Sequence, residues 1–283
     1  MYTEYLNKIA IEAKLRNLTD STAKAYTGCV SHFLTRTNKI PNTLTAEDVR
    51  NFLLIKAQEG LKPRTFNLYN SSIHFFFRYV LQSPWDEYSI PRMKQDYHLP
   101  TVLTLEEVDQ LLDATTNLKY KAIFSTMYSS GLRISEVAHL HYSDISRSKM
   151  QIYIRKSKSR SDRYTILSKR NLDILTCYWL TCNKPTDILF PNRNTKGFLT
   201  NSAVSAKLRQ SLKDAGLNSD ISSHDLRHSF ATHLMEAGVD SRYIQALLGH
   251  RDPRSTQIYL HTSNKSILGI ASPFDREDGD CNV

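Results

Sequence analysis

The sequence predicts a mainly α-helical protein with two domains and one small antiparallel β-sheet. Apolar side chains recur at helical spacing through most of the chain, and a polar stretch between prolines interrupts this pattern once. Two short segments instead alternate apolar and polar residues, as the strands of a hairpin do. We expect a helical N-terminal domain over residues 1–90, a linker over 91–100, an α-rich domain over 101–271 and a disordered acidic tail over 272–283.

Helical patterning dominates the first domain. Residues 22–33 place apolar side chains on one face of a helix. A second helix begins at Thr45, where Asp48 three residues later completes a capping-box pattern. A third helix is expected over residues 64–80, and its many aromatic side chains are expected to fill the core of this domain.

The second domain follows a polar linker that lacks periodicity and is bracketed by two prolines. Thr104 and Glu107 form another capping-box pattern, which opens the helical part of this domain. Residues 151–154 and 163–167 alternate as two short strands, and residues 155–162 form a basic turn between them. The sequence therefore predicts one antiparallel hairpin within a helical domain.

Basic residues outnumber acidic ones, and the net charge is +9 at pH 7. Such an excess favours a nucleic-acid partner, although ordinary solubility charge can also explain it. The basic residues are densest over residues 147–170, where the single acidic residue is Asp162. The side chains expected to contact DNA lie on this hairpin and at the start of the third helix: Lys62, Arg64, Arg155, Lys156, Arg160 and Arg163.

Several classes of protein are excluded. No apolar run approaches the ~18 residues of a membrane-spanning helix, and the N-terminus lacks the pattern of a secretory signal. The four cysteines are scattered, which argues against a disulfide framework and a cysteine zinc site and fits a reducing cytoplasm. Three histidines, His224, His228 and His233, lack a carboxylate or cysteine at matching spacing, so we expect neither a metal nor a cofactor.

The most informative pattern consists of five residues in the second domain: Arg133, His224, Arg227, His250 and Tyr259. Breaking a phosphodiester without a metal needs a nucleophile, cations for the non-bridging oxygens, an acid for the leaving oxygen and a base. The planar fork of arginine meets two phosphate oxygens, and histidine or lysine can transfer protons near neutral pH. A tyrosine can attack phosphorus and hold a covalent phosphotyrosyl intermediate.

Local signals place these residues at the ends of helices. His224 and Arg227 are three residues apart on a helix that is expected to begin just before them, so both lie close to its N-terminus. Gly249 is expected to end the next helix and leave His250 in a loop, and an aspartate-proline pair opens the helix that carries Tyr259. An apolar stripe is expected to hold these helices together: Phe230, Leu234, Ile244, Leu247 and Leu248.

Taken together, these segments resemble the tyrosine recombinases, a family that includes Xer proteins, phage integrases and transposon-encoded resolvases. The resemblance rests on Gly-Leu-Arg-Ile-Ser-Glu at residues 131–136, His-x-Leu-Arg-His at 224–228, Leu-Leu-Gly-His at 247–250 and a tyrosine nine residues later. It covers roughly residues 100–270. It implies the DNA breaking-rejoining enzyme fold behind a SAM-like core-binding domain, with no metal or cofactor.

The resemblance also implies a role for each residue. Arg133 and Arg227 would clamp the scissile phosphate, and His224 would exchange a proton with the tyrosine. His250 would hydrogen-bond a phosphate oxygen, and Tyr259 would attack phosphorus.

The family's general acid is a lysine on a β-hairpin turn, and two lysines are candidates here. Lys158 fits the family pattern Gly-Lys…Asp/Glu-Arg better than Lys156 does, although a serine replaces the usual glycine before it. Glu136 also has two interpretations: it orients Arg133, or it only makes the turn soluble.

The leading hypothesis is a site-specific DNA recombinase that cleaves and rejoins duplex DNA through a 3′-phosphotyrosyl intermediate. It would act on the nucleoid as a homotetramer on two DNA sites, and the apolar segment at residues 267–270 either joins protomers or packs on its own protomer. A type IB topoisomerase shares this chemistry, and a DNA-binding regulator would keep the fold without the reaction. The hairpin turn and the residues after Leu-Leu-Gly-His differ from the usual sequence of Xer proteins. This difference favours a recombinase of a mobile element over one that resolves replicon dimers.

Overall fold

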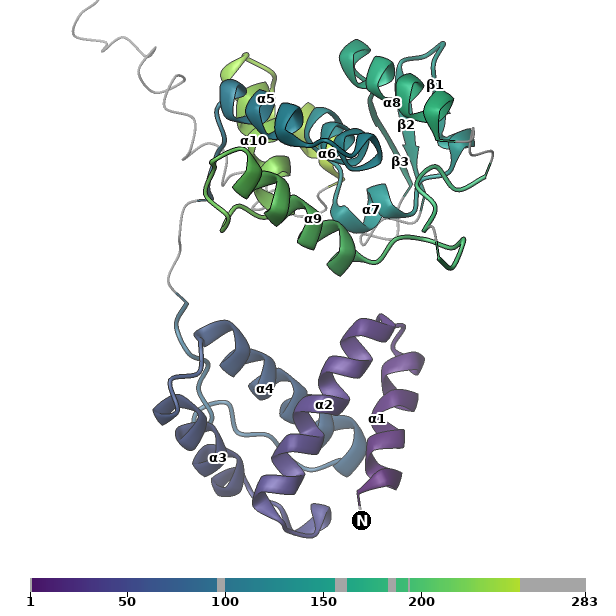
Figure 1. Cartoon of the computed structure of the whole chain (residues 1–283). Helices are drawn as coiled ribbons and strands as arrows, with labels where there is room; N and C mark the ends of the chain where they lie inside the picture. Colours follow the sequence, from purple (N-terminus) through teal and green to yellow (C-terminus); the bar gives the residue numbers. More distant parts are fainter. Residues whose placement is uncertain (1, 96–99, 156–161, 183–186, 193, 250–283) are drawn as a thin grey trace, which may run out of the picture. The chain divides into compact units, whose positions relative to one another are not determined.

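A computed structural model describes residues 2–95, 100–155, 162–182, 187–192 and 194–249. The chain divides into two compact units, Met1–Tyr97 and His98–Val283, and each has its own hydrophobic core. Figure 1 shows the first unit as a group of helices and the second as helices around a small sheet. The predicted fold class, mainly α-helical with a small antiparallel sheet, is therefore confirmed.

The first unit is built from helices whose aromatic faces meet in one core. Its elements are α1 (Thr3–Leu15), α2 (Asp20–Thr37), η1 (Pro41–Thr43), α3 (Ala46–Gln58), α4 (Pro63–Phe76) and η2 (Phe77–Leu81). In Figure 1, α2 packs against both α1 and α4. The capping box predicted at Thr45 is present, with reciprocal hydrogen bonds between Thr45 and Asp48. The third predicted helix is α-helical only to Phe76 and continues as the π-helical turn η2.

The segment after η2 returns along α4 and completes the first unit. The Asn67 side-chain amide donates to the Met93 carbonyl oxygen and accepts from the Met93 backbone N–H. The Asn70 amide donates to the carbonyl oxygens of Ile90 and Pro91. Both asparagines are buried, so these bonds satisfy polar groups that would otherwise destabilise the core. The start of the expected linker therefore packs on α4.

The second unit surrounds a three-stranded antiparallel sheet with helices. Its elements are α5 (Leu105–Ala114), α6 (Leu118–Ser130), α7 (Ile134–Ala138), η3 (Tyr142–Asp144), β1 (Ile145–Ser146), β2 (Gln151–Ile154), β3 (Arg163–Ile166), α8 (Lys169–Thr181), α9 (Asn201–Asp214), α10 (Ser223–Glu236) and α11 (Ser241–Leu248). The strand order is β1-β2-β3, so the predicted hairpin is confirmed and β1 adds an edge strand to it. The capping box of Thr104 and Glu107 at the start of α5 is also confirmed.

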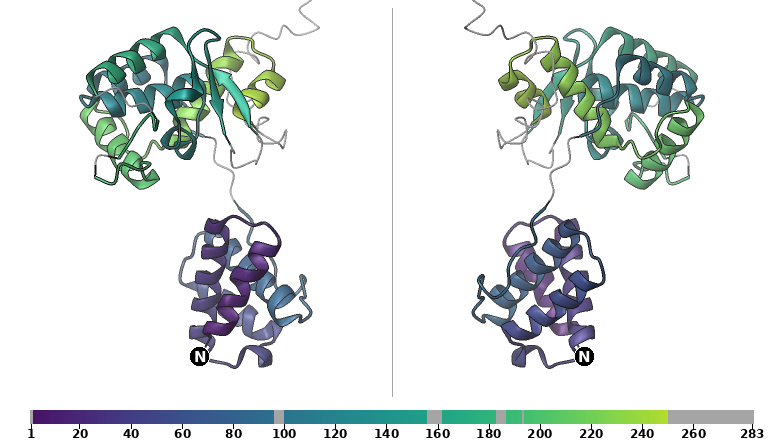
Figure 2. Two further views of the ribbon diagram at one scale, coloured as in Figure 1. Left: turned by 90° about the vertical axis from the view of Figure 1, so that its right-hand side faces the viewer. Right: turned by 90° about the vertical axis from the view of Figure 1, so that its left-hand side faces the viewer.

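Strand β3 connects the sheet to the helices of this unit. It contacts α6, which precedes it in the chain, and α11, which follows it. Figure 2 shows the sheet beside the yellow-green segment that contains α11. Its inward face is polar: Thr165 is 1% exposed and donates a hydrogen bond to the Ser130 carbonyl oxygen. Tyr164 and Ile166 are exposed on the other face. No helix in the described part of the chain is long and apolar enough to cross a membrane.

Two glycines with positive φ end helices next to this region. Gly131 follows α6, and a Cβ there would lie 2.5 Å from a ring carbon of Phe230. Gly249 ends α11 as predicted, and a Cβ there would lie 2.8 Å from the side chain of Arg163. The apolar stripe predicted between α10 and α11 is also present, with three members buried and two partly buried: Phe230, Ile244, Leu248, Leu234 and Leu247.

Candidate active site

Arg133 lies directly before α7, and Glu136 folds back onto it. Glu136 Oε2 accepts from the Arg133 backbone N–H at 2.9 Å, and Oε1 accepts from the guanidinium at 2.8 Å. The Arg133 side chain is 19% exposed, whereas the Glu136 side chain is 4% exposed. Of the two interpretations of Glu136, the structure therefore supports orientation of Arg133, since the carboxylate is buried and bonded to it.

Arg227 lies in the second turn of α10, and its side chain caps the C-terminal ends of two other helices. Its Nη1 donates to the carbonyl oxygen of Gly131 and its Nη2 to that of Leu248, both at 2.6 Å. These carbonyls end α6 and α11, where unpaired C=O groups carry partial negative charge. Arg227 Nη1 also lies 3.7 Å from Glu136 Oε2. One buried carboxylate thus stands beside the guanidiniums of both Arg133 and Arg227.

His224 is exposed in the first turn of α10. The helix begins where predicted, because the Ser222 hydroxyl accepts from the His224 N–H and the Asp225 carboxylate accepts from the Ser222 N–H. Three residues along a helix separate His224 from Arg227, so both project from one side of α10. The N-terminus of a helix favours bound anions, which suits a phosphate at this end.

Five predicted site residues lie outside the described residues: Lys156, Lys158, Arg160, His250 and Tyr259. The first three belong to the connection between β2 and β3, and His250 directly follows the end of α11 at Gly249. Among the residues that the structure does describe, no three His, Cys, Asp or Glu side chains are grouped as ligands of a metal ion.

Arg163 differs from its expected place on a DNA-contacting surface. Its side chain is 7% exposed, and Nη1 and Nη2 donate to the two Glu136 oxygens at 2.9 and 2.8 Å. Its Nε donates to the Leu247 carbonyl oxygen at 2.8 Å. All three nitrogens therefore have partners in the interior, and these contacts do not favour the DNA contact predicted for Arg163, which stays a prediction. The cause is its position on the inward face of β3.

The other described residues that are predicted to contact DNA are on the surface. Lys62 and Arg64 are exposed at the start of α4. Arg155 is also exposed, and its guanidinium is held by the Asp144 carboxylate at 2.7 Å and by the Ser143 hydroxyl. These side chains can meet a phosphate backbone without moving the core.

The charge of Glu136 is stabilised by its neighbours. Burial raises the pKa of this carboxyl, but the hydrogen bonds and positive charge of Arg163 oppose that effect, followed by those of Arg133, and the pKa falls to about 2. Glu136 is therefore ionised at neutral pH. It is the carboxylate shared by three guanidiniums, those of Arg133, Arg163 and Arg227.

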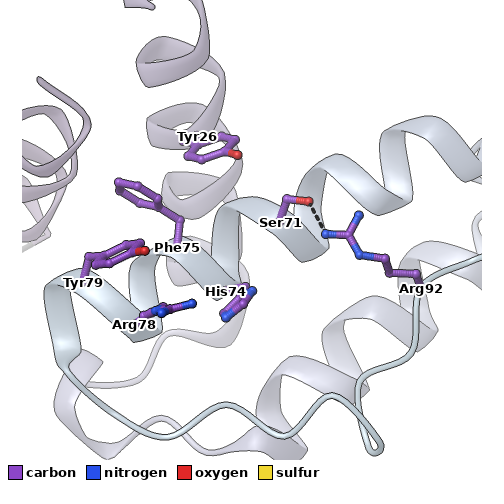
Figure 3. A pocket seen from close by; sticks show the side chains of 7 residues that line it. All are labelled: Tyr26, Ser71, His74, Phe75, Arg78, Tyr79 and Arg92. Atoms are coloured by element: carbon purple, nitrogen blue, oxygen red, sulfur yellow. Dashed lines mark hydrogen bonds between the residues drawn. The ribbon is translucent and has the colours of Figure 1, made fainter. Parts of the chain in front are cut away.

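A second basic site lies on the first unit, where no sequence pattern predicted one. Figure 3 shows a pocket of about 220 Å³ whose lining includes Arg78, Arg92 and His74 and no acidic residue. The Arg92 guanidinium donates to the Ser71 hydroxyl at 3.0 Å. Burial lowers the pKa of His74, and the charge of Arg78 lowers it further. Such a lining suits an anion. The helical spacing of His74 and Arg78 is a weak signal of it, but Arg92 arrives from a distant segment.

Comparison with known proteins identifies the family. Residues 101–266 match the phage integrase family, and residues 5–87 match the N-terminal SAM-like domain of phage integrases. The chain is 31% identical to tyrosine recombinase XerD of Listeria monocytogenes, over 96% of this chain and 97% of that protein. It is 32% identical to tyrosine recombinase XerA of Pyrococcus horikoshii, over 94% of this chain and 91% of that protein.

Solved structures share the fold. The XerH site-specific recombinase in a post-cleavage complex with palindromic difH substrate matches with a TM-score of 0.72 and 22% identity, over 94% of this chain and 83% of that one. A lambda integrase dimer bound to a COC′ core site matches with a TM-score of 0.72 and 17% identity, over 95% of this chain and 97% of that one.

The two matched domains define a DNA breaking-rejoining enzyme of the tyrosine type. The chain belongs to the phage integrase family and is a site-specific tyrosine recombinase. The family, the fold and the enzyme class predicted from the sequence are thereby confirmed.

Proposed function

We propose that this recombinase cleaves and rejoins a specific site in duplex DNA, with Tyr259 as the nucleophile and Arg133 and Arg227 as the clamp on the scissile phosphate. The observation that carries this proposal is the convergence of both guanidiniums on the buried Glu136 carboxylate, from the start of α7 and from α10. Two guanidiniums held in one place are what the non-bridging oxygens of a phosphodiester need in the transition state.

In the proposed reaction, the Tyr259 oxygen attacks the scissile phosphorus and its proton passes to His224. The bond from phosphorus to the 5′ oxygen breaks, and Lys158 gives a proton to that oxygen. The two arginines and His250 neutralise the charge that develops on the non-bridging oxygens. The products are a 3′-phosphotyrosyl bond and a 5′-hydroxyl, and attack by a 5′-hydroxyl on the phosphotyrosyl bond rejoins DNA.

Covalent capture tests this proposal. The probe is a pool of nicked duplexes tiled across the DNA that flanks the gene, in which the short 5′-hydroxyl fragment diffuses away after cleavage. We expect a covalent complex on a few members of the pool only. Capture next to the gene supports action on a mobile element, which we favour over resolution of replicon dimers. Relaxation of supercoiled plasmids that lack any captured sequence would instead indicate a type IB topoisomerase, and failure to capture any member would contradict the proposal.

Replacement of Lys158 by alanine tests the assignment of the general acid. We expect Lys158→Ala to cleave ordinary DNA at least ~100-fold more slowly, because the 5′ oxygen must then leave without a proton. On a substrate with sulfur in place of that oxygen, the variant is expected to recover, since a thiolate leaves without protonation. Lys156→Ala is the matched control and should cleave both substrates at near wild-type rates. The reverse pattern in a single-turnover assay would assign the acid to Lys156.

We also propose that the pocket on the first unit receives a phosphate of the DNA backbone, beside contacts from Lys62 and Arg64. Joint replacement of Arg78 and Arg92 by alanine is expected to weaken DNA binding and to flatten its salt dependence by roughly one to two phosphate contacts. Arg36→Ala is the control, because Arg36 is exposed but pairs with Glu59. An unchanged slope of log Kd against log salt would contradict this contact.

The active assembly is proposed to be four protomers on two DNA sites, joined through the apolar segment at residues 267–270. The mass of the complex on duplexes that carry the captured site checks this number.

A further inference from the structure

We propose that Arg163 is a positioning residue for DNA cleavage, which holds Glu136 and, through it, the guanidinium of Arg133. This inference rests on the proposed function, since it concerns the same reaction. It gives Arg163 a task that neither DNA contact nor core packing describes. The argument starts from the contacts of its guanidinium.

The guanidinium of Arg163 is fully committed inside the second unit. Two parallel hydrogen bonds join it to both oxygens of Glu136, and a third joins Nε to the carbonyl oxygen of Leu247. The two Nη atoms of the planar guanidinium thus bind Glu136 while Nε binds Leu247, an arrangement that the ammonium group of a lysine cannot reproduce. Thr165, two residues along the same face of β3, bonds the Ser130 carbonyl oxygen. The inward face of β3 is thus tied to the segment that contains Arg133.

Glu136 is shared, and this sharing connects Arg163 to Arg133. Oε1 accepts from both guanidiniums, from Arg133 at 2.8 Å and from Arg163 at 2.9 Å. Without Arg163, the cationic side chains that remain beside the buried carboxylate, among the residues that the structure describes, would be Arg133 and Arg227. It would attract both more strongly, and each would be drawn away from a bound phosphate. Arg163 therefore leaves the phosphate clamp available by satisfying the carboxylate itself.

Arg163 also lies where three segments with predicted catalytic residues meet. It is the first residue of β3, so the connection that contains Lys158 ends at it. Its bond to Leu247 holds the last turn of α11, from which the chain continues to His250. Gly249 leaves no room for a Cβ against the Arg163 side chain, so this packing is close. A single guanidinium thereby fixes the start of β3, the Arg133 segment and the end of α11 relative to one another.

The test replaces Arg163 by methionine, which keeps the length and removes the charge. Cleavage of a nicked substrate in single turnover is expected to slow on the order of 100-fold, because a clamp displaced by about 1 Å loses that much. The Kd for DNA should stay within about threefold, since Arg163 does not face solvent. Arg170→Met is the matched control, because Arg170 is exposed and pairs with Asp109. It should cleave at the wild-type rate.

A neutral substrate separates positioning from mere stability. With a methylphosphonate at the scissile position, one non-bridging oxygen becomes a methyl group, and the arginine clamp has less charge to neutralise. We expect the deficit of Arg163→Met to shrink at least tenfold on this substrate. A variant that only loses folded protein would show the same deficit on both substrates, and that result overturns the proposal.

A second variant covers the case in which Arg163→Met does not fold. Joint replacement of Glu136 and Arg163 by methionine removes the carboxylate together with the arginine that bonds to both of its oxygens, so fewer guanidiniums lose their partner than when Glu136 alone is replaced. We expect this double variant to fold and still to cleave slowly, because nothing then orients Arg133. Wild-type cleavage by either variant, or failure of the double variant to fold, rejects the positioning role. If wild-type protein itself captures no DNA, the proposed function has failed instead.

Discussion

The Tyr259→Phe variant is expected to form no covalent complex on nicked DNA, with a cleavage rate at least ~10⁴-fold below wild type. Phenylalanine lacks the oxygen that would bond to phosphorus, so no other property of the site can compensate. Binding of duplex DNA should change by less than about twofold, because phosphate contacts supply most of the affinity. A denaturing gel detects the covalent product, and a binding titration on the same duplex measures affinity.

Tyr243→Phe is the matched control for this substitution. Tyr243 lies on α11 and is 67% exposed, so loss of its hydroxyl disturbs no core. It is expected to capture DNA at the wild-type rate. A covalent complex that persists in Tyr259→Phe, with a labelled peptide from elsewhere in the chain, would move the nucleophile to another tyrosine.

The second large effect is expected for Glu136→Ala. This change leaves three guanidiniums in a largely buried cluster without their shared carboxylate. Removing one partner of a buried ion pair costs about 3–5 kcal/mol, which lowers the Tm of a unit of this size by roughly 10 °C. Cleavage should be lost as well, since Arg133 then has no orienting partner. Calorimetry with a parallel capture assay measures both effects.

Asp109→Asn is the control for Glu136→Ala. Asp109 also pairs with an arginine, but the pair is exposed, so its loss should change stability by less than about 1 kcal/mol. Equal loss of stability in the two variants would show that burial of the Glu136 cluster does not increase its contribution to the free energy of unfolding.

The same carboxylate predicts how stability depends on pH. Its pKa is about 2 in the folded protein and near 4.5 without these contacts. A group with a lowered folded pKa stabilises the fold above its unfolded pKa, and this contribution is lost as pH falls from 4.5 towards 2. On the order of 3 kcal/mol is involved. Unfolding by denaturant at several pH values should show the loss in wild type and a flatter profile in Glu136→Gln.

Local signals predicted much of this fold. The capping boxes predicted at Thr45 and Thr104 involve residues three apart, so each is visible in a short stretch of sequence. The end of α11 at Gly249 follows from the conformational freedom of glycine, which also acts locally. Arg133 and Arg227 are predicted to be site residues because they lie in family motifs. Their convergence on Glu136 could be seen only in the structure.

The orientation of β3 could not be predicted. Alternation alone would turn Tyr164 and Ile166 towards the core and leave Arg163 in solvent. The structure has the opposite arrangement, because Glu136 and the Leu247 carbonyl oxygen offer partners to an inward-facing arginine. Those partners are distant in sequence. The same reason applies to the pocket on the first unit, which needs Arg92 from beyond η2.

The unequal charges in the Glu136 cluster have a thermodynamic consequence. Three guanidiniums against one carboxylate leave a net charge of +2, so without DNA this part of the enzyme repels itself. In the proposed function, a phosphodiester bound by Arg133 and Arg227 brings negative charge to this cluster. DNA binding and folding of the second unit are therefore linked equilibria, and DNA at 100 times its Kd adds about 2.7 kcal/mol to stability. The proposed contact with the scissile phosphate would then stabilise the fold of the second unit as well as serve cleavage.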